Sequence, residues 1–211
     1  MLSTNNSEEF DSQARGRVLA WLAENVPPSR IEHVLRVEQM AIALAKHHNI
    51  NVEQAAISGL MHDLAKYFKP QKLLAMAQAE GLEIDAVSEA NPHLLHADVG
   101  AIVARDIFGV KNREVLDAIA DHTLGRPGMN ALSCIVFLAD SLEPGRGDDL
   151  ELNTIRETCY SNLAQAVWLT CDYSLKALVT TQRLIHPRTV ATRNWFLQKV
   201  KNLQQIPRQT A

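Results

Sequence analysis

The chain has 211 residues, of which 46% are hydrophobic and 21% charged, and its formal net charge is −3. This composition is typical of a globular protein and excludes a disordered chain, or one with a general affinity for nucleic acid or anionic membranes. A chain of this length can build one well-packed domain, in which an anionic ligand would need a local positive site from a metal ion or a few arginines.

Residues 1–13 are polar and acidic and are expected to form a disordered tail. They lack the basic and apolar regions of a secretion signal, and no apolar run approaches the ~20 residues of a membrane span. Cys134, Cys159 and Cys171 are not spaced as in a zinc site and indicate reduced, buried thiols. We therefore expect a cytoplasmic protein whose folded domain covers residues 14–205.

Apolar residues at helical spacing, without runs of alternating β-branched residues, predict an all-α, single-domain helical bundle. Pro27-Pro28 would end the first helix and Ser29 would cap the second. The stretch 82–95 is expected to be a loop. The predicted helices cover residues 14–25, 30–48, 52–67, 70–81, 96–108, 112–123, 130–143, 152–184 (with a break allowed near Thr170) and 188–203.

Histidines and aspartates occur on helix faces that are otherwise apolar. His33 lies on an apolar stripe, the pair His62-Asp63 lies near the end of the next predicted helix, and Asp140 follows the run Ile-Val-Phe-Leu-Ala. Burying an unpaired carboxylate costs several kcal/mol, so Asp63 and Asp140 each need a cation or many hydrogen bonds. A metal ion would meet this need, and the two imidazoles are nitrogen ligands suited to iron, manganese or zinc.

Each of these residues also has a simpler interpretation. A single histidine on an apolar helix face is more often a hydrogen-bonded core residue than a ligand, and a His-Asp pair arises often by chance. A buried Asp140 could instead cap a helix or pair with an arginine. The ordered set, with every member facing inward, favours the metal site.

The other histidines divide into two groups. His96 and His122 begin and end neighbouring predicted helices beside small or turn-forming residues. Side chains at such a rim would contact substrate oxygens or a second metal ion. The histidines expected to face solvent are His47, His48, His93 and His186.

The order His…His-Asp…Asp resembles the signature of the HD superfamily of metal-dependent phosphohydrolases. Longer strings resemble one branch of it, the YqeK-type symmetrical diadenosine tetraphosphate hydrolases of bacteria, over nearly the whole chain, from Arg15 to Asn202. The strings are Arg30-Ile-Glu-His33-Val-Leu-Arg-Val, Gly59-Leu-Met-His62-Asp63-Leu-Ala-Lys66, Leu94-Leu-His96-Ala-Asp-Val-Gly-Ala, Asp121-His122-Thr-Leu-Gly-Arg-Pro-Gly-Met and Phe137-Leu-Ala-Asp140-Ser-Leu-Glu-Pro-Gly-Arg146.

The resemblance implies a metal-dependent hydrolase that cleaves diadenosine tetraphosphate and related dinucleoside polyphosphates into two nucleoside diphosphates. A metal would lower the pKa of a bound water, and Asp63 would accept its proton. One or two divalent ions, often iron in this branch, with manganese, cobalt or zinc as alternatives, would be held by His33, His62, Asp63 and Asp140. The catalytic residues would be Asp63, His96 and His122. The substrate would be bound by Arg30, Lys66, His96, His122, Gly125, Arg126 and Arg146.

Two rival functions stay open at this point. Another HD activity, such as a nucleotidase, a phosphodiesterase or a guanosine-tetraphosphate hydrolase, would use the same ligands, because the fold alone does not select the substrate. A non-catalytic nucleotide-sensing HD module usually lacks one ligand, whereas every ligand position here has a competent residue. The C-terminal helices with Trp168 and Trp195 would form either core or the surface of a homodimer. We expect no nucleic-acid or membrane partner.

Overall fold

A computed structural model describes residues 12–205 of the protein. Apart from its last two residues, the tail expected over 1–13 therefore lies outside the described residues. Within the described part the chain forms helices and no strand, which confirms the predicted all-α fold. The helices are α1 (Ser12–Asn25), α2 (Pro28–His47), α3 (Val52–Met61), α4 (Pro70–Ala79), α5 (Ala86–Ala90), η1 (Pro92–Leu95), α6 (His96–Asp106), α7 (Arg113–Asp121), α8 (Ala131–Leu142), η2 (Pro144–Arg146), α9 (Leu150–Ser161), α10 (Leu163–Thr180) and α11 (Pro187–Gln205), where η denotes a 3-10 helix.

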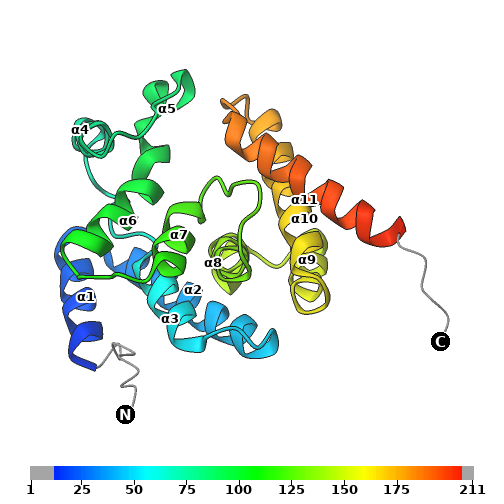
Figure 1. The fold of residues 1–211 in the computed structure, drawn as a ribbon, viewed down its shortest axis with the longest axis horizontal. Helices are drawn as coiled ribbons and strands as arrows, with labels where there is room; N and C mark the ends of the chain where they lie inside the picture. Colours follow the sequence, from blue (N-terminus) through cyan, green and yellow to red (C-terminus); the bar gives the residue numbers. More distant parts are fainter. Residues whose placement is uncertain (1–11, 206–211) are drawn as a thin grey trace, which may run out of the picture.

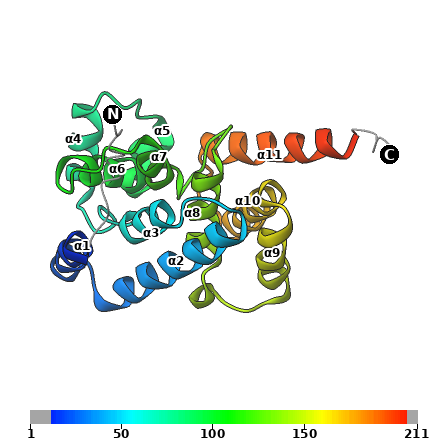
Figure 2. The same cartoon turned by 60° about the horizontal axis from the view of Figure 1, so that its bottom comes forward.

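Helix α8 lies in the middle of the bundle (Figure 1) and packs against α2, α3, α7, α9 and α10. Helices α2 and α3 pack against each other, and α6 packs against α7. Helix α10 packs against α8, α9 and α11, and the C-terminal part of α11 extends away from the other helices (Figure 2). The helices that carry the candidate site residues are therefore neighbours in the central part of the bundle.

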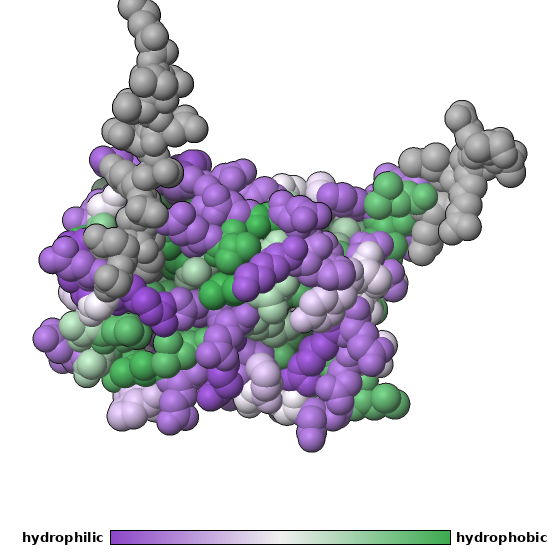
Figure 3. Space-filling view, turned by 90° about the horizontal axis from the view of Figure 1, so that it is seen from below, coloured by the Kyte–Doolittle hydropathy of each residue, from purple (hydrophilic) through white to green (hydrophobic). Residues whose placement is uncertain are grey.

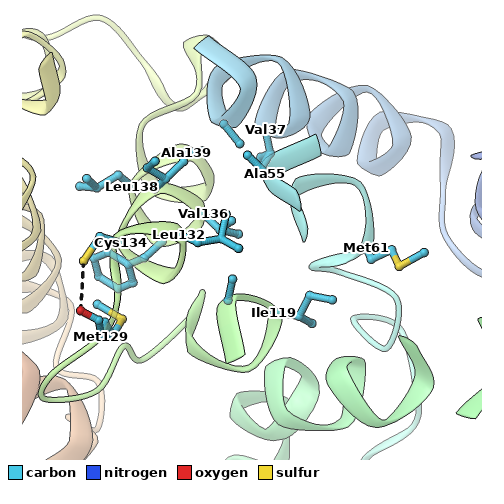
Figure 4. Close-up of a cluster of buried hydrophobic side chains, with 14 of the residues drawn as sticks. Val37, Ala55, Met61, Ile119, Met129, Leu132, Cys134, Val136, Leu138 and Ala139 are labelled. Atoms are coloured by element: carbon cyan, nitrogen blue, oxygen red, sulfur yellow. Dashed lines mark hydrogen bonds between the residues drawn. The ribbon is translucent and has the colours of Figure 1, made fainter. Parts of the chain in front are cut away.

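The core is built by apolar faces that meet around α8 (Figure 4). Val37 of α2, Ala55 of α3 and Ile119 of α7 are fully buried, as is Val136 of α8. The three cysteines are also buried and free, as predicted, and the thiol of Cys134 donates a weak hydrogen bond. Burial of these faces is the main favourable contribution to folding and fixes the relative positions of the four helices.

Gly59 lets α2 and α3 approach very closely. A Cβ atom at this position would lie 2.9 Å from the Cα atom of Glu38, closer than real Cβ atoms come to backbone. The lack of a side chain at Gly59 is therefore what admits α2 at this distance. The close approach brings His62, at the end of α3, toward His33 on α2.

Helix α2 begins in a different way from the prediction. Its N-cap is Pro27 and its first residue is Pro28, so Ser29 lies inside the helix and does not cap it. Proline suits the first helical position, because its fixed φ is already helical and the missing N–H would have no partner within the helix. The prediction of a Ser29 cap was wrong.

Two further predictions about the helices were wrong. The stretch 82–95, expected to be a loop, contains α5 and η1, and α5 begins where the side chain of Asp85 accepts hydrogen bonds from the backbone. The long helix predicted over 152–184 is divided into α9 and α10 at Asn162, whose side chain caps α10. Thr170 lies buried within α10 and does not interrupt it.

The exposed face shown in Figure 3 has separate hydrophobic patches among hydrophilic side chains. Trp168 and Trp195 are partly buried and pack against the core. None of the helices in residues 12–205 combines the length and the apolar character that crossing a membrane requires.

Candidate metal centre

Four side chains from three separate parts of the chain converge in the bundle. The Nε2 atom of His33 lies 3.0 Å from Oδ1 of Asp140 and 4.0 Å from Oδ2 of Asp63. The Nε2 atom of His62 lies 3.4 Å from Oδ2 of Asp63 and 3.8 Å from Oδ1 of Asp140. His33, His62 and Asp63 are buried, whereas 17% of the Asp140 side chain is exposed. The structure thus brings together all four residues that the sequence assigns to the metal.

His62 and Asp63 owe their positions to the early end of α3. The sequence predicts a helix to residue 67, but α3 ends at Met61, and residues 62–67 form tight turns. In a continuous helix, neighbouring side chains would point about 100° apart. The turns let both side chains point into the same space, so the predicted extent of this helix was wrong.

All four histidines near the site present the same ring nitrogen to it. The Nδ1–H groups of His62, His96 and His122 donate to backbone carbonyls at 2.7, 2.5 and 2.7 Å. A carbonyl only accepts, so each Nδ1 carries a proton, and each Nε2 offers its lone pair whenever the ring is neutral. His33 achieves the same orientation by donating from Nδ1 to a carboxylate. This is the arrangement of metal-binding histidines, in which the second nitrogen fixes the tautomer.

The carboxylate that orients His33 belongs to Glu143, which the sequence analysis did not single out. Its Oε1 atom lies 2.9 Å from Nδ1 of His33, and its Oε2 atom accepts from Nε of Arg36 at 2.5 Å and from the backbone N–H of Gly145 at 2.6 Å. The glutamate is only 1% exposed. The signal in the sequence was its place in the Leu-Glu-Pro-Gly-Arg string, directly after α8.

The residues present fit a divalent cation. Nε2 of His62 and Oδ1 of Asp63 are buried and have no hydrogen-bond partner. An orphaned buried acceptor is costly, and here the two orphans are a neutral nitrogen and an anionic oxygen, both of them metal ligands. Ligand atoms of His33, His62 and Asp63 all lie within 4.8 Å of one another, as do those of His62, His122 and Asp140.

A second group adjoins the first through Asp63. Its Oδ1 atom lies 3.3 Å from Nε2 of His96 and 3.6 Å from Nε2 of His122, and the two Nε2 atoms are 3.0 Å apart. The hydroxyl of Thr123 lies 3.1 Å from Nε2 of His96 and 2.9 Å from Nε2 of His122. Thr123 was missed by the sequence analysis, although it directly follows His122. Asp63, His96 and His122 could hold a second ion or act on a substrate beside the first.

Three cationic side chains line the site. Arg30 lies 3.1 Å from Oδ2 of Asp63, and Nζ of Lys66 lies 3.1 Å from Nε2 of His96. Arg146 donates to Oδ1 of Asp140 at 2.5 Å and is 38% exposed. Cations in these positions can meet an anion that enters on the exposed side of Asp140.

Gly125 and Arg126 do not join this group. Arg126 pairs with Asp117 at 3.2 Å and with Asp121 at 3.3 Å, both on α7. Gly125 has φ +61°, and a Cβ atom there would come within 2.6 Å of the Thr192 side chain on α11. Arg126 is thus engaged with α7, and Gly125 packs closely against α11, while their role in substrate binding stays a prediction.

The expectation that four histidines face solvent holds for His47 and His93, which are exposed, but was wrong for His186. His186 is buried, and its Nε2 lies 2.7 Å from Asp85. His48 is half-buried and donates to a backbone carbonyl of α9.

Burial and the close charges act in opposite directions on the titration of the site. Burial raises the pKa of the Asp63 and Asp140 carboxyls, but protonated neighbouring imidazoles and, at Asp140, the guanidinium of Arg146 outweigh it and hold both pKa values well below the usual range. Burial lowers the pKa of His122 to about 4. The centre is therefore built from ionised carboxylates and, at His122, a neutral imidazole, the forms in which these groups bind a metal.

Comparison with known proteins agrees with this geometry. Residues 30–145, more than half of the chain and all four residues of the first group, match the HD domain family. The chain belongs to the HD family. Membership implies a divalent metal, which the His and Asp groups described above are able to bind.

Two relatives of this HD protein are bacterial enzymes named symmetrical bis(5'-nucleosyl)-tetraphosphatase. The one from Bacillus subtilis is 31% identical, and the alignment covers 87% of this chain and 97% of the relative. The one from Halalkalibacterium halodurans is 30% identical over 89% of this chain and 99% of the relative. A crystal structure from Clostridium acetobutylicum, described as a predicted HD superfamily hydrolase involved in NAD metabolism, superposes with a TM-score of 0.83. It is 32% identical, over 87% of this chain and 97% of the other.

Proposed function

We propose that the protein hydrolyses diadenosine tetraphosphate symmetrically to two ADP. The observation that carries this proposal is the convergence of four imidazoles, through Nε2, on the buried carboxylate of Asp63 and the partly exposed carboxylate of Asp140. Relatives aligned over nearly their whole length are named for this reaction. Related dinucleoside polyphosphates are expected to be substrates as well, because they share the polyphosphate bridge.

In this proposal His33, His62, Asp63 and Asp140 hold the metal ion. Iron is the metal we propose, with manganese, cobalt or zinc as alternatives for the same nitrogen and oxygen ligands. When bound, such an ion supplies a Lewis acid that lowers the pKa of a water molecule and polarises a phosphoryl oxygen. Asp63, His96 and His122, whose ligand atoms lie within 4.8 Å of one another, would hold the second ion if the protein uses two.

Asp63, His96 and His122 move the proton of the attacking water. The water oxygen attacks one of the two middle phosphorus atoms, and the bond from that phosphorus to the oxygen joining the two halves breaks. Oδ1 of Asp63 accepts the water proton and passes it to Nε2 of His96, 3.3 Å away. The imidazolium so formed, beside His122, donates the proton to the oxygen of the departing ADP.

Arg30, Lys66 and Arg146 bind the phosphate oxygens. Each already contacts a member of the His and Asp groups, so an anion bound to these cations would lie beside the carboxylates. Their charges would offset the negative charge that builds on the phosphoryl oxygens in the transition state. A planar guanidinium such as that of Arg146 suits two-point contact with phosphate.

The test is product analysis with metal-loaded protein. Protein prepared anaerobically with iron, or with manganese, cobalt or zinc, is offered diadenosine tetraphosphate, guanosine tetraphosphate and deoxynucleoside monophosphates, and the products are separated by ion exchange. We expect metal-dependent release of ADP alone from the first substrate. Release of AMP and ATP, or no turnover by protein that holds metal, would contradict the proposal, and the second result would favour a sensing module.

We also propose a cytoplasmic location and action on a small molecule, without a nucleic-acid or membrane partner. The three free buried thiols support the location, because a reducing compartment keeps such thiols unpaired. A homodimer is the alternative to a monomer, and sedimentation velocity at several protein concentrations distinguishes the two states.

A further inference from the structure

We propose that a cavity of about 400 Å³ beside the metal centre binds one nucleoside of the substrate. The cavity lies among η1, the start of α6, the first part of the α7–α8 loop at Leu124, the residues around α5, and the turn that begins α11. This inference rests on the proposed function, because it assigns a place to the part of the dinucleotide that the metal centre does not bind.

The cavity shares its backbone with the catalytic groups. Leu95, in its wall, directly precedes His96, and Leu124 directly follows Thr123, whose hydroxyl lies 3.1 Å from Nε2 of His96. Consecutive Cα atoms are about 3.8 Å apart, so the backbone of the wall at Leu95 and Leu124 lies directly beside that of His96 and Thr123. A nucleoside joined to the cleaved bond through two phosphates must lie to one side of the reacting phosphorus, and a cavity whose wall is one residue away from His96 and from Thr123 offers it a place.

The charges around the cavity exclude a phosphate and favour a nucleoside. Glu83, Asp85 and Asp98 line it, and the guanidinium of Arg188 is already paired with Asp98 through two contacts of 3.2 and 3.3 Å. The acidic groups thus outnumber the arginine, and a phosphate would meet like charge. Carboxylates at such a site accept hydrogen bonds from ribose hydroxyls, as in dinucleotide-binding folds.

The rest of the wall suits a purine. Leu94, Leu95 and Leu124 give it an apolar side, and a cavity of this size is within the usual range for small-molecule sites. The Nε–H of Arg188 is buried and has no hydrogen-bond partner in residues 12–205. A ring nitrogen of a base is the kind of acceptor that would satisfy it.

The polar cluster of Asp85, Ser88 and His186, at the other end of the cavity, has a structural role. Nε2 of His186 lies 2.7 Å from Asp85 and 3.1 Å from the hydroxyl of Ser88, while its Nδ1 accepts from the backbone N–H of Arg188. Nδ1 is therefore unprotonated, and the proton on Nε2 is directed at Asp85 and Ser88. No ring nitrogen is left to take a proton from the serine, so these three residues join α5 to the start of α11 and do not form a hydrolytic triad.

The test compares a cavity-filling variant with a control in the same part of the chain. Leu94→Trp places an indole in the cavity, and Leu184→Trp adds the same indole at a residue that is 59% exposed and does not line it. Adenosine binding to metal-loaded protein is measured by calorimetry at millimolar ligand, and KM for diadenosine tetraphosphate by product assay. Pyrophosphate, which has no nucleoside, serves as a competing probe of the metal centre.

We expect Leu94→Trp to weaken adenosine binding and to raise KM by about tenfold or more, since the indole occupies the site. Its kcat and its inhibition by pyrophosphate should match those of the control. Arg188→Lys, which keeps the charge that faces Asp98 but lacks the Nε–H group, should weaken adenosine binding if Leu94→Trp fails to fold. Wild-type protein that does not bind adenosine, or a folded Leu94→Trp with unchanged binding and KM, would overturn the inference. Adenosine binding that Leu94→Trp removes, in protein that does not cleave diadenosine tetraphosphate, would support the cavity and contradict the proposed reaction.

Discussion

Glu143 fixes the ring of His33 although the two residues are 110 positions apart in the sequence. The distance from Oε1 of Glu143 to Nδ1 of His33 is 2.9 Å, and Arg36 and the N–H of Gly145 hold the other carboxylate oxygen in place. Because Nδ1 donates to this carboxylate, Nε2 of His33 points its lone pair at Asp140 and Asp63. A carboxylate in this position also makes the imidazole a stronger ligand.

Replacing Glu143 by glutamine should weaken the metal site without removing a ligand. The amide keeps the length of the side chain but loses the charge, so we expect metal affinity to fall by about 10- to 100-fold. Competition with a chelator measures the affinity directly. Glu157→Gln, at an exposed residue of α9, is the matched control and should bind metal as the wild type does. Wild-type affinity in Glu143→Gln would show that the contact does not support the site.

Removing His62 should abolish both metal binding and turnover. Its Nε2 atom is fully buried and orphaned beside Asp63, and alanine leaves that carboxylate without the nitrogen ligand. His93→Ala is the control, because His93 is exposed and only its backbone carbonyl contacts His96. The metal content of the purified protein and the rate of ADP release are the two measurements. A His62→Ala protein that keeps its metal and its activity is incompatible with the ligand assignment.

A methyl group at residue 59 should force α2 and α3 apart. The added Cβ of Gly59→Ala would lie 2.9 Å from the Cα atom of Glu38, so the backbone must shift, at a cost of roughly 1–3 kcal/mol in the free energy of unfolding. Gly16→Ala on α1 is the control, since a Cβ there has nothing within 4 Å, and it should stabilise the protein by about 0.5–1 kcal/mol. Urea denaturation measures both changes. Equal stability of the two variants would rule out the close approach.

Asp121 should make stability depend on pH. Burial raises the pKa of its carboxyl to about 6, although Arg126 opposes the shift. A carboxyl whose pKa is higher in the folded than in the unfolded state favours folding while it is protonated, so its contribution is complete below about pH 4 and is lost as the pH rises through about 6. Relative to Asp121→Asn, which stays neutral, the wild type should lose up to roughly 3 kcal/mol between about pH 4 and 7.5. Urea denaturation at both pH values tests this, and a constant difference between the two proteins would refute it.

The sequence was sufficient for the fold class and for the first group of site residues, because both depend on local patterns. Helical spacing of apolar residues predicted the helices, and the apolar sequence context of Asp63 and Asp140 called for a compensating charge. The ends of the helices were harder to predict, because tertiary contacts decide them. Helix α3 stops at Met61, where turns direct His62 and Asp63 into one space, although the sequence pattern continues to residue 67.

The residues that the sequence analysis missed act through partners that are distant in the chain. Glu143 becomes functional only when η2 places it against α2, and His186 is buried only because Asp85 and Ser88 of the α5 region meet it. Arg126 belongs to a motif that suggests a substrate contact, which stays a prediction, and the structure adds that two aspartates of α7 pair with its guanidinium. Such contacts need the packed bundle and cannot be inferred from spacing along one helix.

The most direct test of the account is hydrolysis of diadenosine tetraphosphate in water labelled with oxygen-18, using iron-loaded protein and mass spectrometry of the products. Attack of water on a middle phosphorus predicts two ADP per turnover, one of which carries a single labelled oxygen on its β-phosphate, and no product from His62→Ala. Label found in AMP or ATP, or the same turnover by His62→Ala, would contradict a water-attacking metal centre built on these histidines and aspartates.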